Sequence, residues 1–577
     1  MKVFSSFPLF ANRNQCDIVD HRSGGRRGKK AMRDAGSLAL RRRRRRRYMA
    51  LLGTGVACFL GPMLVFQITL YRQNLAVARE TFPTAPAFAA TDRLLIISPH
   101  CDDETLGAGG TIAAARQQGL AVRVAFLTNG DGSRSTQIEQ DTRLLRRNSF
   151  QQLAAMRQRE TVAALNELNV ARDDIVFLGY PDGGTQTMWQ KNWTRDNRFR
   201  SKWTGADRSP YKNSMTPNAP YSGAQMLDDV AKLISDFQPT VVFTTHPDDT
   251  HPDHWAAYSY TLAALEKLRL QPSTRSLAQR TKLLTFLVHH GVWPAPHGYH
   301  PEAKLAPPAD LLHVGTRWME TPLDKASRVA KKAALERYVS QLAFTPHYLR
   351  GFLRRNELFG VVPLGSLQME DGTTEALKTA ILRDPVRDSF VHEVWAGGDI
   401  QTIWARQVTA DEANSSSEPA LRLRIQAPEG ARASRRLSYR LALHAITPSG
   451  VRAANIEIGG SGSNMHASFN PIDAPDEQNN DSSKASPEPK SYALAASRVP
   501  GGVKVNIPLR LLTQGHEAMS LLVSASTYLG TARLDQTGTG AVRVVPPMSL
   551  AGGNEGYATM TARSPRPLPA HSRTRLN

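Results

Sequence analysis

The sequence predicts an α/β fold with a doubly wound, mostly parallel sheet, followed by an all-β part. In the first part, apolar β-branched runs such as Leu94–Ile97 and Val241–Thr244 alternate with helical segments. Loops rich in His and Asp follow these two runs directly. After Gly360 the helical patterns give way to short runs of alternating apolar and polar residues, which are typical of antiparallel strands.

The N-terminal region predicts a membrane anchor. Residues 1–47 form a basic tail with 15 Lys or Arg and 3 Asp, which we expect to be disordered. Residues 48–71 carry no charge, and as a helix these 24 residues would measure about 36 Å, enough to cross a ~30 Å hydrocarbon core. Because Arg41–Arg47 lie directly before them, we expect one span with the N-terminus in the cytoplasm and the rest on the periplasmic or extracytoplasmic side.

Two alternatives to the anchor concern the same region. A cleaved signal peptide is the first, because Ala87-Phe88-Ala89 has the small-x-small pattern of a cleavage site. Nucleic-acid binding by the Arg run is the second. Since the run abuts an apolar stretch and has no interleaved aromatics, we interpret it as a topology signal and expect no nucleic-acid partner.

After a spacer at residues 72–91, residues 92–360 are expected to form the α/β domain. Strands are expected at Leu94–Ile97, Val122–Leu127, Ile175–Leu178, Val241–Thr244 and Leu283–Val288. Helices are expected at Thr105–Gln118, Leu144–Leu168, Ala224–Phe237, His254–Leu268 and Asp324–Leu342. This alternation predicts a Rossmann-like topology. Residues 185–222 lack a clear period, and their Trp and Tyr side chains fit either a substrate wall or an insertion that packs on its own domain.

The C-terminal part is expected to begin with a linker at residues 361–387. Alternating runs such as Leu421–Ile425 and Leu437–Ile446 then predict a β-sandwich-like accessory domain at 388–547. Residues 471–490 are rich in Asp, Asn, Ser and Pro, so we expect a disordered insertion there, and a disordered tail at 548–577.

Two motifs carry candidate chemistry, Ser98–Glu104 and Thr245–His254. Each follows a predicted parallel strand, and the carboxyl ends of such strands meet at one edge of the sheet. The motifs would therefore bring imidazoles and carboxylates together. This mixture suits a mononuclear divalent metal with one position open to water, with zinc as the first choice and another divalent metal possible. The sequence thus predicts metal-assisted hydrolysis.

With their context, these motifs resemble the PIG-L (LmbE-like) family of zinc-dependent N-acetylglucosaminyl deacetylases over roughly Asp92–Leu342. Pro99–Glu104 is similar to the family's Pro-His-Pro-Asp-Asp-Glu, with Cys101 in place of a proline, and His251–His254 matches its His-Pro-Asp-His. The other matching segments are Arg157–Glu160, Phe177–Gly184 and Ala334–Gln341.

The resemblance implies a role for each matching residue. His100, Asp103 and His254 would ligate the metal. Asp102 would be the general base. His251 would stabilise the oxyanion or protonate the leaving amine, and Asp253 would hold a histidine in the correct tautomer. The roles for Arg157 and Asp182 would be contacts with the sugar.

Three further polar residues of the second motif, His246, Asp248 and Asp249, are interpreted as loop residues because the downstream His-Pro-Asp-His carries the match. The Cys101 side chain is expected to turn away from the metal.

From the resemblance we expect a membrane-anchored de-N-acetylase that releases acetate from an N-acetylglucosamine-type sugar in a glycolipid, polysaccharide or glycoconjugate. The alternatives are a non-catalytic glycan-binding envelope protein and a zinc amidase acting on another N-acyl conjugate. We expect the β domain to have an accessory role in binding glycan, an expectation that rests only on its attachment to a domain that resembles sugar deacetylases.

Overall fold

The structure, a computed structural model, describes residues 45, 48–49, 53–54, 61–132, 147–368, 379–386, 396–408, 419–430, 436–460, 465–473, 491–513 and 518–545. Most of the predicted tail 1–47, much of the predicted span 48–71, most of the insertion 471–490 and the tail 548–577 lie outside this set. Within it, no helix is both long and apolar enough to cross a membrane. The chain divides into two compact units, Met1–Thr69 and Leu70–Asn577.

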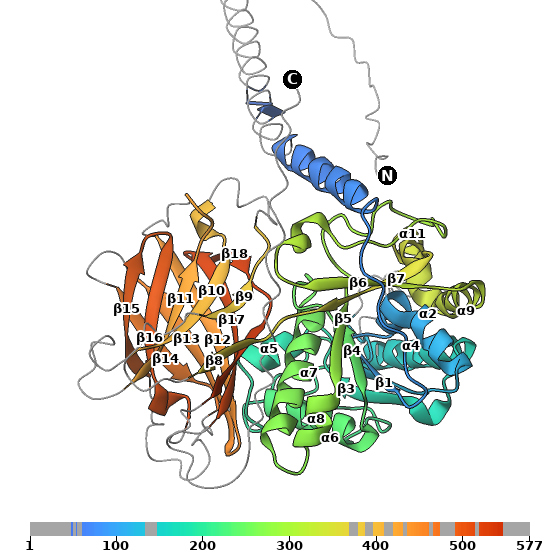
Figure 1. The fold of residues 1–577 in the computed structure, drawn as a ribbon, viewed down its shortest axis with the longest axis horizontal. Coiled ribbons are helices and arrows are strands. Elements are labelled where there is room, and N and C mark those ends of the chain that lie inside the picture. The colour runs from blue at the N-terminus through green and yellow to red at the C-terminus, as the bar shows by residue number, and fades with distance from the viewer. Residues whose placement is uncertain are drawn as a thin grey trace, which may run out of the picture. The chain divides into compact units, whose positions relative to one another are not determined.

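A seven-stranded sheet organises the α/β part of the second unit, in the order β3-β2-β1-β4-β5-β7-β6 (Figure 1). Its strands are β1 Arg93–Ser98, β2 Ala121–Thr128, β3 Ile175–Tyr180, β4 Val241–Thr245, β5 Lys282–Phe286, β6 Arg317–Pro322 and β7 Asn356–Val361. The first five run parallel, whereas β7 is antiparallel to both β5 and β6. The predicted mostly parallel α/β sheet is confirmed.

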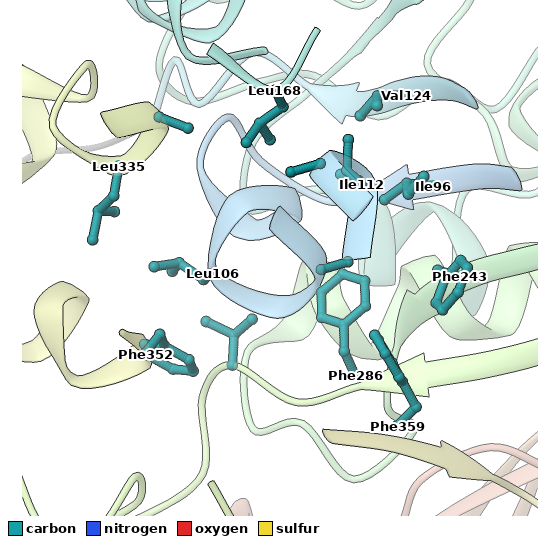
Figure 2. Packing of buried hydrophobic residues seen from close by; sticks show 14 of the residues in the cluster. Ile96, Leu106, Ile112, Val124, Leu168, Phe243, Phe286, Leu335, Phe352 and Phe359 are labelled. Carbon is teal, nitrogen blue, oxygen red and sulfur yellow. The ribbon is translucent and has the colours of Figure 1, made fainter. Parts of the chain in front are cut away.

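Helices cover both faces of this sheet, as a doubly wound fold requires. They are α2 Asp103–Gln117, α4 Arg147–Glu167, α5 Thr185–Gln190, α6 Gly223–Phe237, α7 Pro252–Leu270, α8 Arg275–Arg280, α9 Lys325–Leu335, α10 Val339–Leu342 and α11 Pro346–Leu349. Leu94 and Ile96 of β1 share a core with α2, α4 and α9, whereas Leu95 and Ile97 share another with α5, α6 and α7. Figure 2 shows Ile112 of α2 next to Ile96. The strand is therefore buried on both sides, which explains its uninterrupted apolar run.

One helix was predicted from the sequence over 324–342, but the structure contains two helices there, α9 and α10. It also places α5 inside the segment expected to be irregular, whose remainder, 191–222, up to the N-cap of α6, holds no strand or helix.

The C-terminal part is one twelve-stranded sheet. Its strands are β8 Gly365–Gln368, β9 Thr379–Arg383, β10 Thr402–Val408, β11 Ala420–Gln426, β12 Leu437–Thr447, β13 Gly450–Gly459, β14 His466–Pro471, β15 Tyr492–Val499, β16 Gly502–Pro508, β17 Met519–Leu529, β18 Ala532–Gln536 and β19 Gly540–Val545. Inward residues of β10, β11 and β16 share a core with those of β12, β13 and β17, so two stretches of sheet face each other. The expected linker, 361–387, contributes β8 and β9, because their backbones extend this sheet at its two ends.

The β-rich part packs against α7. Ile446 of β12 and Leu522 of β17 belong to the same buried cluster as the apolar side chains of α7. At the edge of this contact, the buried carboxylate of Glu266 accepts hydrogen bonds from Arg543 Nη2 at 2.6 Å and Ser520 Oγ at 2.5 Å. Helix α7 is therefore buried between the two sheets, and the second His-rich motif leads directly into this helix.

Candidate metal centre

The two His- and Asp-rich motifs lie side by side because β1 and β4 are neighbouring parallel strands. The first motif turns sharply into α2. Asp102, the N-cap residue, has φ of 125°, a left-handed value that is rare and strained for a residue with a Cβ. Its backbone N–H is held by Glu104 Oε2 at 3.1 Å, and Tyr338 donates to the other oxygen of Glu104 at 2.5 Å. This strained turn lets Asp102 and Asp103 face different partners.

Three buried side-chain atoms that could coordinate a metal ion converge at this edge of the sheet. His100 Nδ1 lies 3.2 Å from Asp103 Oδ2 and 3.2 Å from His254 Nε2, and the two latter atoms are 3.0 Å apart. Ligands bonded tetrahedrally to zinc at 2.0–2.1 Å would stand about 3.3 Å from one another. Two imidazoles and a carboxylate at this spacing fit a divalent metal ion. The structure thus brings together the three predicted ligands.

Each histidine is oriented by a carboxylate on its outer nitrogen. His100 Nε2 lies 3.1 Å from Asp253 Oδ2, and His254 Nδ1 lies 3.1 Å from Asp249 Oδ2. Burial alone would raise the pKa of both carboxyls, but contact with His100 holds the pKa of Asp253 well below its usual range, and His254 does the same for Asp249. When each imidazole is neutral, its outer nitrogen therefore carries the proton, and its inner nitrogen presents a lone pair to the metal position.

Asp102 lies outside this triad and faces Arg157. Its Oδ2 is 3.6 Å from Arg157 Nη2, which donates to the carbonyl of Cys101 at 2.6 Å. Burial raises the pKa of Asp102 to about 8, against the opposing charge of Arg157, while Asp103 raises it further. Arg157 is itself buried, so the structure places it behind Asp102. Cys101 belongs to the hydrophobic core, away from the donor atoms.

His251 and Asp182 complete the predicted set. His251 is the N-cap of α7, and its Nδ1 accepts a hydrogen bond from the Asp253 N–H at 3.3 Å. Its ring centroid lies 4.7 Å from that of His100. Asp182 Oδ1 is 3.6 Å from His100 Nε2, and its Oδ2 accepts from the Gly132 N–H at 2.9 Å. All eight predicted residues therefore lie around one position.

The family model described as "PIG-L: GlcNAc-PI de-N-acetylase" matches residues 95–265. The chain contains a PIG-L family domain. The 1D-myo-inositol 2-acetamido-2-deoxy-alpha-D-glucopyranoside deacetylase of Mycobacterium sp. (strain KMS) is 33% identical over 188 residues, which cover 31% of this chain and 52% of the relative. The chain therefore spans about half the length of this relative.

Two other similar proteins are more distant. A protein of the same name from Nocardia farcinica (strain IFM 10152) is 27% identical over 286 residues, covering 48% of this chain and 88% of the relative. The solved N,N'-diacetylchitobiose deacetylase from Pyrococcus horikoshii is 18% identical and covers 47% of this chain and 84% of its own, with a TM-score of 0.30.

Sequence reasoning missed two residues of the PIG-L site. Asp249, interpreted as a loop residue, accepts hydrogen bonds from His254 Nδ1 and from the Val288 and His289 N–H groups. His289 offers a donor atom within 4.8 Å of those of Asp103 and His254, and its ring stacks on Tyr348. The sequence could have indicated His289 by its position, because it follows β5, a parallel strand that ends at the same edge of the sheet.

By contrast, His246 and Asp248 fit the loop role expected of them. His246 Nε2 lies 3.0 Å from Thr316 Oγ1, and its Nδ1 accepts from the Asp248 N–H at 3.2 Å.

Proposed function

We propose that this protein is a zinc-dependent de-N-acetylase that hydrolyses the N-acetyl group of an N-acetylglucosamine-type sugar and releases acetate. The observation that carries the proposal is the triad of His100 Nδ1, Asp103 Oδ2 and His254 Nε2, with Asp102 and His251 beside it. The PIG-L match and the deacetylase names of the relatives support the same reaction.

The residues of the site divide the work of amide hydrolysis. His100, Asp103 and His254 would hold the ion, which when bound would polarise the amide carbonyl and lower the pKa of water. Asp102, which is not a ligand, accepts the proton of the attacking water and passes it to the departing amine. Arg157 holds this carboxylate in place through its contact at 3.6 Å.

Of the two roles that the resemblance implied for His251, the hydrogen bonding favours one. Because its Nδ1 accepts from the Asp253 N–H, neutral His251 carries its proton on Nε2. That N–H can donate to the oxygen that becomes negative when water adds to the carbonyl. His251 thus stabilises the oxyanion, and Asp102 delivers the proton to nitrogen.

The two neighbouring aspartates give the sharpest test. Asp103→Ala should lose zinc and deacetylation together, because one of three protein ligands is removed. Asp102→Asn should keep zinc and lose roughly 100-fold or more in turnover, the usual scale for a positioned proton acceptor. Zinc content and acetate release on N-acetylated sugars would be measured for both. An Asp102→Asn protein with full zinc and near-wild-type turnover would contradict the proposal, and zinc binding without acetate release by the wild type would favour the glycan-binding alternative.

We further propose that residues 48–71 anchor the protein in a membrane, with the N-terminus in the cytoplasm and the PIG-L domain on the outer side, where glycolipids and polysaccharides are accessible. The uncharged 24-residue stretch and the preceding Arg41–Arg47 support this arrangement. Protease added to spheroplasts should digest the domain while the membrane is intact. Complete protection of the domain until lysis would refute the topology.

A further inference from the structure

The β-rich part is fixed beside the first turns of α7, the helix that carries His254. Trp255 Nε1 donates to the Thr537 carbonyl at 3.0 Å, and Ser259 Oγ lies 2.7 Å from Thr539 Oγ1. Trp255 follows His254 directly, so the segment from β18 to β19 is held next to the metal centre by side chains of the same helix.

A cleft of about 360 Å³ lies between this segment and the PIG-L domain. Its lining from the PIG-L domain includes Gln186, residues 247–250, Pro252, Trp255 and His290, and its lining from the β-rich part is residues 384–385 and 533–538. This volume lies within the usual range of small-molecule sites. The β-rich part therefore supplies one wall of a cavity that the PIG-L domain alone would lack.

Residues that line the cleft are neighbours of the catalytic groups in the sequence, and one of them, Asp249, contacts His254 Nδ1 at 3.1 Å. Thr250 and Pro252, which line it, flank His251 in the sequence. Gln186, also in the lining, follows Thr185, whose N–H donates to Asp253 Oδ1 at 3.2 Å. A chain molecule with one unit at the metal centre would therefore place a neighbouring unit in the cleft.

The lining indicates what that unit is. Amide and carboxylate groups of Gln186, Gln536 and Asp384 can bond hydroxyl groups, while Leu534 and the prolines offer apolar surface to a ring face. The four carboxylates Asp248, Asp249, Asp384 and Asp535 outnumber the one guanidinium in the lining, that of Arg533, and His290 is paired with Asp310 at 2.8 Å. A phosphate or sulfate is disfavoured there.

We propose that this cleft binds the sugar next to the reacting unit, so that the preferred substrate is an uncharged N-acetylhexosamine oligosaccharide. The inference rests on the proposed function and assigns the β-rich part a direct role in substrate binding. The residues that carry it are Arg533 and Gln536, which contact each other on the β-rich wall.

The test compares the full-length protein on N-acetylglucosamine and on uncharged N-acetylhexosamine tetrasaccharides of several linkages. The wild type should show a KM at least tenfold lower for one tetrasaccharide, the effect of about one good polar interaction. Gln536→Trp, which fills the cleft, and Arg533→Ala should raise that KM about tenfold and threefold. Both should keep kcat and KM for the monosaccharide within about twofold. Arg440→Ala is the matched control, since Arg440 is an exposed arginine of β12 paired with Glu457 outside the cleft.

The outcomes separate the two proposals. A wild type that turns over the monosaccharide but gains nothing from any tetrasaccharide would overturn the cleft assignment and leave the deacetylase intact. The same conclusion would follow if Gln536→Trp kept the full advantage of the tetrasaccharide. A wild type with zinc that deacetylates neither class would instead overturn the proposed function.

Discussion

Replacing Asp249 by asparagine should weaken zinc binding although Asp249 is not a predicted ligand. Its Oδ2 faces three N–H donors, His254 Nδ1 at 3.1 Å, Val288 N at 3.0 Å and His289 N at 2.9 Å, and its Oδ1 faces the His251 N–H at 3.0 Å. An asparagine has one acceptor oxygen, so its NH₂ group must face at least one of these donors. The loss of a carboxylate behind a ligating histidine typically costs 10–100-fold in metal affinity, or about 1.4–2.7 kcal/mol.

The pH should change the size of this loss. Burial opposes protonation of His254, but Asp103 and Asp249 outweigh it and raise its pKa to about 9 in the metal-free protein. Below that pH, zinc must displace a proton that Asp249 helps to hold, so Asp249→Asn removes part of this competition. The affinity ratio of wild type to variant should therefore be larger at pH 9.5 than at pH 7.

A chelator-competition titration at both pH values measures this ratio. Thermal unfolding measures a second effect of Asp249→Asn: a buried N–H group loses its acceptor, which should lower the free energy of unfolding by about 1–3 kcal/mol. Asp248→Asn is the matched control, because its carboxylate lies 3.7 Å from His246, whereas that of Asp249 faces His254. Equal zinc affinity of Asp249→Asn and wild type at both pH values would refute the reasoning.

Three further outcomes are expected. Zinc binding at pH 7 should release about two protons, since carboxylate contacts raise the pKa of both ligating imidazoles without the metal, that of His254 to about 9 and that of His100 well above its usual value, and calorimetry in buffers of different ionisation enthalpy checks this; no buffer dependence would contradict it. Glu266→Gln should lower the free energy of unfolding by about 1–2 kcal/mol without changing zinc stoichiometry, because the half-exposed Arg543 would exchange a charged hydrogen-bond partner for a neutral one; an unchanged denaturant midpoint would show that the contact is unimportant. Burial lowers the pKa of His444 to about 3, so its contribution to stability is complete above pH 6.5 and falls as the pH drops toward 3; at pH 4.5, His444→Phe should remove about 2–3 kcal/mol of acid destabilisation, and parallel stability–pH curves would count against it.

The sequence predicts this site well where the chemistry lies at the ends of parallel strands. His100, Asp103 and His254 converge because β1 and β4 are neighbours, and both strands were visible as apolar runs. Asp249 and His289 were not assigned, because their contact depends on how the loops after β4 and β5 approach each other, which no local pattern encodes.

The docking of the β-rich part was also not predicted from the sequence. The sequence feature that indicates this docking lies in α7, where Trp255–Leu265 is apolar on nearly every side. A helix of this kind must be covered all round. Periodicity indicates such burial, but it does not identify the partner, which here is the distant pair β12 and β17.

The burial of α7 between two sheets has a consequence for synthesis. The strands that cover its second face, β12, β17 and β19, end at Val545, whereas α7 ends at Leu270. At about 5–20 residues per second, the ribosome needs roughly 15–55 s to make this stretch. During that time the nascent PIG-L domain exposes the apolar face of α7. This interval, rather than the stability of the finished protein, is where a chaperone that holds apolar surface would act on the chain.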